Sequence, residues 1–71
     1  MTTQEKITNE INDELLHLGD KVGELEKFID SKTFKKLSFH HQDLLYAQYN
    51  TMCAYANILH LRQDVIDEEE E

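Results

Sequence analysis

The residues best suited to chemistry in this sequence are basic and aromatic side chains near the middle of the chain. Residues 27–36 carry four lysines and one aspartate, and aromatic residues lie among and after them. Aromatic rings stack on nucleobases, and lysine or arginine neutralises the phosphates beside them. The candidate ligand-binding residues are Lys32, Lys35, Lys36, Phe39, His40, Tyr49 and Arg62. A run of this kind is also typical of a solvated turn, in which Phe34 and Leu37 close the end of a helical core.

Other chemistry is poorly supported by the residue types and their spacing. The four histidines show no His-x-x-x-His spacing, and we expect them to be exposed helix residues rather than metal ligands. Cys53 has no histidine placed to activate it, so it is either a small apolar residue at a helix contact or one half of a disulfide across a dimer axis. Glycine-rich phosphate loops, nucleophile elbows and paired catalytic carboxylates are not found. We therefore expect no enzymatic activity, no cofactor and no metal.

Length and charge narrow the class of protein. A chain of 71 residues buries only about 60% of its unfolded surface, so we expect self-association to supplement a marginal core. A net charge of −8 argues against a long nucleic acid or an anionic membrane as partner. The chain has no apolar run near the roughly 20 residues of a transmembrane span. With one cysteine, a reducing compartment such as the cytoplasm is expected.

Hydrophobic periodicity predicts the elements that position these residues. One apolar stripe has spacings of 4, 4, 3, 4, 3 and 4, and it predicts a helix over about 3–30 that is capped by Thr2 or Thr3. Its members are Ile7, Ile11, Leu15, Leu18, Val22, Leu25 and Ile29. A second stripe, spaced 3, 4, 3, 4, 3 and 4, predicts a helix over about 39–67 that is capped by Ser38. Its members are Leu45, Gln48, Met52, Tyr55, Leu59, Arg62 and Ile66.

The predicted fold is all-α: an antiparallel two-helix hairpin over residues 1–67 that assembles into a homo-oligomeric helical bundle. Residues 31–38 form the connection, and residues 68–71 form a disordered acidic tail because four like charges repel one another. The expected core and oligomer interface comprises Leu18, Val22, Leu25, Ile29, Leu45, Gln48, Met52, Tyr55 and Leu59. Gln48 and Arg62 are polar members of the apolar stripe, so they either fix the register of the bundle or bind phosphate at an oligomer interface.

Residues 11–66 resemble a group of small helical-hairpin proteins of tailed phages and prophages, related to one from a crAss-like gut phage. The positions that carry the resemblance are Leu25, Phe28, Ile29, Ser31, Phe34, Leu37, Leu44, Leu45, Gln48, Met52, Tyr55, Ile58, Leu59 and Arg62. By architecture the chain is also similar to viral cyclic-nucleotide sponges that antagonise CBASS and Thoeris defence. Those are short helical hairpins that bind signalling nucleotides between protomers.

The resemblance implies a non-enzymatic counter-defence protein in the cytoplasm of an infected bacterium. Its expected partners are further copies of itself and a cyclic di- or trinucleotide, with no long nucleic acid and no membrane. Two alternatives remain open from the sequence. The first is an acidic module that blocks a host protein by mimicking nucleic acid, and the second is a structural accessory protein of a phage.

Overall fold

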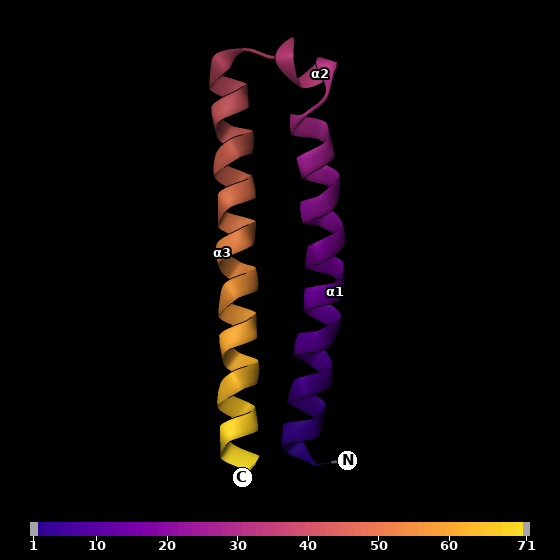
Figure 1. Cartoon of the computed structure of the whole chain (residues 1–71), viewed down its shortest axis with the longest axis vertical. Coiled ribbons are helices and arrows are strands. Elements are labelled where there is room, and N and C mark those ends of the chain that lie inside the picture. The colour runs from indigo at the N-terminus through magenta and orange to yellow at the C-terminus, as the bar shows by residue number, and fades with distance from the viewer. Residues whose placement is uncertain (1, 71) are drawn as a thin grey trace.

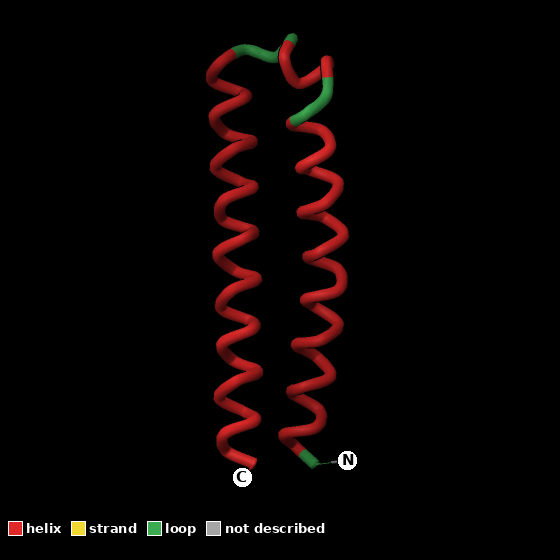
Figure 2. Tube along the Cα trace, viewed as in Figure 1, coloured by secondary structure: helices red, strands yellow, loops and turns green. Residues whose placement is uncertain are grey.

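The computed structural model describes residues 2–70, and side chains over residues 2–69. The element order is α1 (Thr3–Ile29), α2 (Lys32–Lys35) and α3 (Phe39–Glu70), with no strand in the described range (Figures 1 and 2). Helices α1 and α3 lie side by side and run in opposite directions, and α2 lies in the turn between them (Figure 1). The molecule is a rod of 51 × 15 × 13 Å. The prediction of an all-α fold is confirmed.

Each helix begins at a hydroxyl side chain that accepts a backbone N–H, because the first N–H groups of a helix have no partner within it. Thr2 Oγ1 accepts the N–H of Glu5 at 3.1 Å, and Ser31 caps α2 in the same way. Ser38 Oγ accepts the N–H of His41 at 3.2 Å, as the sequence predicts. These caps account for the starts of the three helices.

The connection between the long helices is built around Phe34, which is 3% exposed. Its ring makes edge-on contacts with Phe28 of α1 and Tyr46 of α3, at centroid distances of 6.2 and 5.4 Å. The side-chain amide of Gln42 donates to the carbonyl oxygens of Leu37 and Phe34 at 3.0 and 3.3 Å. Phe34 therefore closes the turn end of the core.

The core runs along the seam between α1 and α3. Ile11, Leu59 and Ile66 are buried, and Ile7, Leu15 and Leu18 pack against them. The remaining members of the predicted α1 stripe, which are Val22, Leu25 and Ile29, are half-buried. The stripe predicted for α1 is thus the face that α1 turns to α3.

The seam of α3 differs from the predicted stripe at three positions. Its buried and half-buried residues at heptad spacing are Leu45, Tyr49, Met52, Ala56, Leu59, Gln63 and Ile66, and Gln42 and Cys53 are half-buried as well. Tyr49, Ala56 and Gln63 thus occupy places where the sequence suggested Gln48, Tyr55 and Arg62, which are exposed. Gln63 contributes a side-chain hydrogen bond to Asn12 of α1. The shift is possible because α3 carries apolar residues on more than one side, so periodicity alone does not select the face that packs on α1.

The C-terminal end of α3 extends beyond the predicted helix. Residues 68–70 continue the helix, whereas the sequence suggests that residues 68–71 are disordered. Residue 71 and the side chain of residue 70 lie outside the described residues.

Candidate ligand-binding sites

The predicted lysines gather at the turn end of the rod. Lys32 and Lys35 belong to α2 and Lys36 follows it, and all three are exposed. Within the described part of the chain, none of the three pairs with a carboxylate. Unpaired, solvated ammonium groups are free to neutralise a phosphate without first breaking an ion pair. This end is therefore the most basic part of an otherwise acidic protein.

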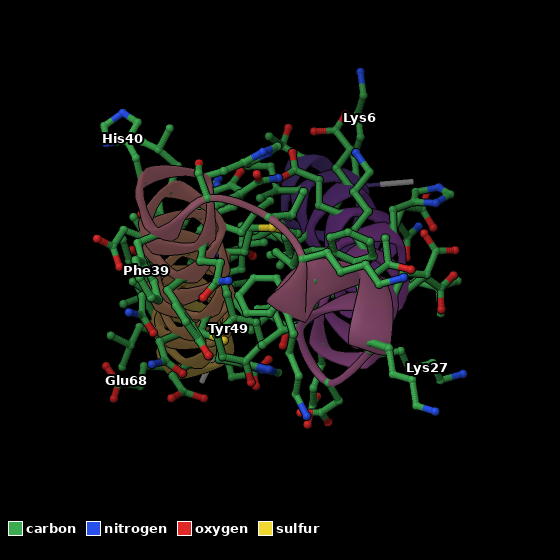
Figure 3. All side chains as sticks on the ribbon, turned by 90° about the horizontal axis from the view of Figure 1, so that it is seen from above. Lys6, Lys27, Phe39, His40, Tyr49 and Glu68 are labelled. Carbon is green, nitrogen blue, oxygen red and sulfur yellow. The ribbon has the colours of Figure 1, made fainter. Side chains whose placement is uncertain are left out.

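Phe39 and His40 lie at the same end, on the first turn of α3. Phe39 is 84% exposed, a large apolar surface for a ring that has no packing role within the chain. Figure 3, viewed from above, shows Phe39 and His40 on the α3 side and Lys27 on the far side of α1. The basic and aromatic groups thus surround the end of the rod rather than enclose a pocket.

A concave site lies just below this end, between α1 and α3. It has a volume of about 260 Å³ and is lined by Glu26, Ile29, Asp30, Tyr46, Tyr49 and Asn50. Figure 3 shows Tyr49 between the two long helices. We name it the tyrosine pocket. Two phenol rings offer stacking surfaces, and its carboxylate and amide oxygens accept hydrogen bonds from hydroxyl or amino groups.

The tyrosine pocket is electrostatically unlike the lysine-rich end. The pKa of Tyr49 is raised above its ordinary value, chiefly by the negative charge of Glu26, then by Cys53 and, less strongly, by partial burial and Asp30. A phosphate placed there would meet the same repulsion. The pocket therefore suits a neutral ring or a sugar hydroxyl, and the phosphate of the same ligand would have to lie on the lysines.

A second hollow lies toward the opposite end of the rod. It is a groove of about 390 Å³, lined by Ile7, Ile58, Leu61, Arg62, Val65 and Ile66. Five aliphatic side chains and one guanidinium make it a surface for apolar groups, with one fixed positive charge beside them. We name it the aliphatic groove.

The structure does not bring all the predicted ligand-binding residues together within one chain. Arg62 lies 13 residues beyond Tyr49 on α3, which is about 20 Å along the helix. The lysines, Phe39 and His40 share the turn end, Tyr49 lies in the tyrosine pocket, and Arg62 lies in the aliphatic groove. Any single site that uses all of them needs a second chain.

Sequence reasoning missed four lining residues of the tyrosine pocket: Glu26, Asp30, Tyr46 and Asn50. They come from two helices and converge only when α1 and α3 pack together. Glu26 and Asp30 are four residues apart at the C-terminal end of α1, as are Tyr46 and Asn50 on α3, so the sequence places each pair on one face of its helix but does not bring the two pairs together.

Two other kinds of site are not found among the described residues. No three side chains of the histidine, cysteine, aspartate and glutamate type converge there as metal ligands would. None of the described helices combines the length and apolar content needed to cross a membrane.

Architecture and family place the chain in a defined class. It is a small all-α protein with two long paired helices, a basic end and a pocket between the helices. It belongs to the Sequestin family, whose model matches residues 5–65. This match covers most of both long helices and all of the turn between them. The search of curated proteins and the search of solved structures found no match.

Proposed function

We propose that this protein is a non-enzymatic, phage-encoded counter-defence protein that sequesters a cyclic oligonucleotide immune signal between the protomers of a homo-oligomer. It would act in the cytoplasm of an infected bacterium. The observation that carries the proposal is the cluster of exposed, unpaired lysines next to a highly exposed aromatic ring at one end of the rod. The name of the Sequestin family supports sequestration of a ligand.

The chemistry of the turn end matches the parts of a cyclic nucleotide. Lys32, Lys35 and Lys36 supply positive charge for the phosphodiester groups. Phe39 and His40 supply rings for stacking on bases, which is worth about 1–3 kcal/mol per base. The tyrosine pocket accepts a base edge or a ribose hydroxyl. Arg62 reaches the ligand only from another copy of the chain, so the proposed site is shared between protomers.

Isothermal titration with a panel of cyclic di- and trinucleotides tests the proposal. We expect stoichiometric binding of at least one member that weakens as salt is raised, because lysine–phosphate attraction is screened. Heating the complex should release the nucleotide unchanged, as chromatography would show. Release of a cleaved product would contradict the non-enzymatic part, and absence of binding to every member would refute the proposal.

A pair of charge-matched variants locates the site. Lys32→Ala combined with Lys35→Ala should weaken binding at least about tenfold, since a hydrogen bond to a charged group contributes about 1.5–3 kcal/mol and 1.4 kcal/mol is tenfold. Lys6→Ala combined with Lys21→Ala removes the same charge from exposed positions of α1 and should change affinity less than about twofold. Equal effects of the two variants would show that the lysines act only through net charge.

A second candidate function rests on the acidic surface of α1. Glu5, Glu10, Asp13, Asp20 and Glu24 are exposed along a rod 51 Å long. Such a surface suits a basic groove on a host protein that normally holds nucleic acid. A stoichiometric, salt-sensitive protein partner recovered from host lysate, with no nucleotide binding, would favour this function.

A further inference from the structure

Helix α3 carries a second apolar stripe that does not face α1. It begins at Leu44 and continues through Ala47, Thr51, Ala54, Ile58, Leu61 and Val65, at spacings of 3, 4, 3, 4, 3 and 4. All of these residues are exposed, and none of them is charged. A sustained heptad spacing of this kind is the pattern by which one helix packs along another.

The second stripe lies on the side of α3 away from its partner helix. At about 100° per residue, it is centred roughly 140° around α3 from the stripe that packs on α1. Leu44, Ile58, Leu61 and Val65 are each 50–63% exposed, although most large apolar residues of a soluble domain are buried. A helix that is apolar on opposite sides is typical of one that packs on both.

The sizes of the side chains along the stripe are graded. Ala47, Thr51 and Ala54 are small and lie in its first part, whereas the large Ile58, Leu61 and Val65 lie in its second part. Consider two copies whose stripes pack in opposite directions about a two-fold axis at residue 56. A residue of one copy then meets the residue of the other copy whose number brings the sum of the two to 112.

In that pairing Ile58, Leu61 and Val65 each lie against a small side chain of the other copy, and Leu44 lies opposite Glu68 of the partner subunit, beyond the stripe. Ala54 meets Ile58, Thr51 meets Leu61, and Ala47 meets Val65, each of them twice by symmetry. Interdigitation of large and small residues fills a helix interface without voids. Parallel packing would instead set the large residues against one another and leave a gap at the small ones.

The polar residues beside the stripe favour the same register. Gln48 then faces Arg62 of the partner subunit, and Asn50 faces Asp64 of the partner subunit. At the axis Tyr55 and Asn57 meet their own copies. A shift of one heptad would make the stripe positions sum to 105, and the positions beside the stripe sum to 103 or 107. It would therefore set Asp43 against Asp64 of the partner subunit. Like charges facing each other across two helices are unfavourable, so charge selects the register about residue 56.

We propose that two copies of this chain associate through the second stripe of α3, antiparallel and about a two-fold axis at residue 56, to form a four-helix dimer. The interface also covers part of the aliphatic groove, since Ile58, Leu61 and Val65 line both. This deepens the oligomer of the proposed function and does not depend on the nature of the ligand.

Cross-linking with two matched cysteine variants tests the dimer and its register. In a Cys53→Ser background, Asn57→Cys and Asn50→Cys each place one thiol at an exposed position on the same side of α3. Residue 57 lies close to residue 57 of the other copy, because both are next to the two-fold axis. Position 50 lies about 18 Å along the helix from its own copy, beyond the roughly 7 Å between Cα atoms that a disulfide spans.

We expect the Asn57→Cys protein to form a covalent dimer under mild oxidation, and the Asn50→Cys protein to remain a non-covalent dimer by light scattering. A monomer at all concentrations would overturn the proposal, as would a dimer in which Asn57→Cys does not cross-link or Asn50→Cys cross-links as readily. Nucleotide titration of the wild-type protein, in which the tyrosine pocket is intact, separates the two proposals. A dimer of this register that binds no nucleotide refutes only the function, whereas a monomer that binds one refutes the interface and the sharing of the site between protomers but not nucleotide binding itself.

Discussion

Leu59 is the side chain whose loss should weaken this protein most clearly. It is 0% exposed and lies in a core that also contains Ile11 and Ile66. Truncation of a buried leucine to alanine costs about 2–5 kcal/mol, from lost burial and from the cavity that remains. A 71-residue chain has a free energy of unfolding of about 4–10 kcal/mol in all. Leu59→Ala should therefore remove a large share of the stability, about 3 kcal/mol.

Thermal unfolding followed by circular dichroism measures this loss. A change of about 3 kcal/mol should lower Tm by about 12–24 °C in a chain of this size. Leu61→Ala is the matched control, because it removes the same atoms from a side chain that is 63% exposed. We expect Leu59→Ala to lower Tm at every protein concentration. Leu61→Ala should lower Tm mainly at concentrations at which wild type is dimeric, since it affects association. Equal losses for the two variants in dilute solution would refute the seam described for α3.

Three further predictions concern the N-cap of α3, the hydrogen bond from Tyr55 to Glu14 of α1, and the second stripe. Ser38→Ala should lower the free energy of unfolding by about 1 kcal/mol in urea, because it removes the cap of α3. The Tyr55 hydroxyl donates to the Glu14 carboxylate at 2.5 Å, and this bond, with partial burial, raises the pKa of Tyr55 above its ordinary 10.0. The folded state favours the neutral form of Tyr55. Its contribution to the free energy of unfolding should therefore be complete below pH 10 and be lost as pH rises through the raised pKa of Tyr55. Urea unfolding at a series of alkaline pH values should show a smaller decline for Tyr55→Phe, and an unchanged decline would contradict the bond. Ala54→Glu should give a monomer in sedimentation, because it buries a charge against the partner subunit. The control His60→Glu, at an exposed position outside the stripe, should remain dimeric. A dimeric Ala54→Glu protein would count against the interface.

The two long helices differ in how far their packing could be predicted. The apolar residues of α1 lie largely on one side, with acids over the rest, so the stripe from Ile7 to Ile29 indicates the buried face without ambiguity. Helix α3 is apolar on two sides, and a heptad can be drawn through either. The choice between Gln48 and Tyr49, and between the equivalent residues one and two heptads further on, depends on which residues meet α1, and this is a property of the pair of helices.

The candidate sites divide in the same way. The lysines of the turn end are consecutive enough in sequence to be found as a charge cluster, and a turn leaves them exposed. The tyrosine pocket combines Glu26 and Asp30 with residues that follow 16 or more positions later, so nothing local indicates it. Its acidic character would repel a phosphate, which fits the base-stacking role that the sequence suggests for Tyr49.

The sequence by itself determined that the chain is helical, where its two long helices begin, that α1 has one buried face, and that positive charge collects at the turn, but it did not indicate the short helix α2. These follow from local properties: hydroxyl caps, the 3.6-residue period and the order of charges along the chain. Only the tertiary structure decided which side of α3 packs on α1, and hence that Gln48, Arg62 and the second stripe are exposed, while Tyr55 is exposed but keeps its hydroxyl bonded to Glu14 of α1. The reason is that a helix with two apolar sides has two packing solutions of similar local energy. The choice between them is made by the shape and hydrogen bonds of the helix it meets.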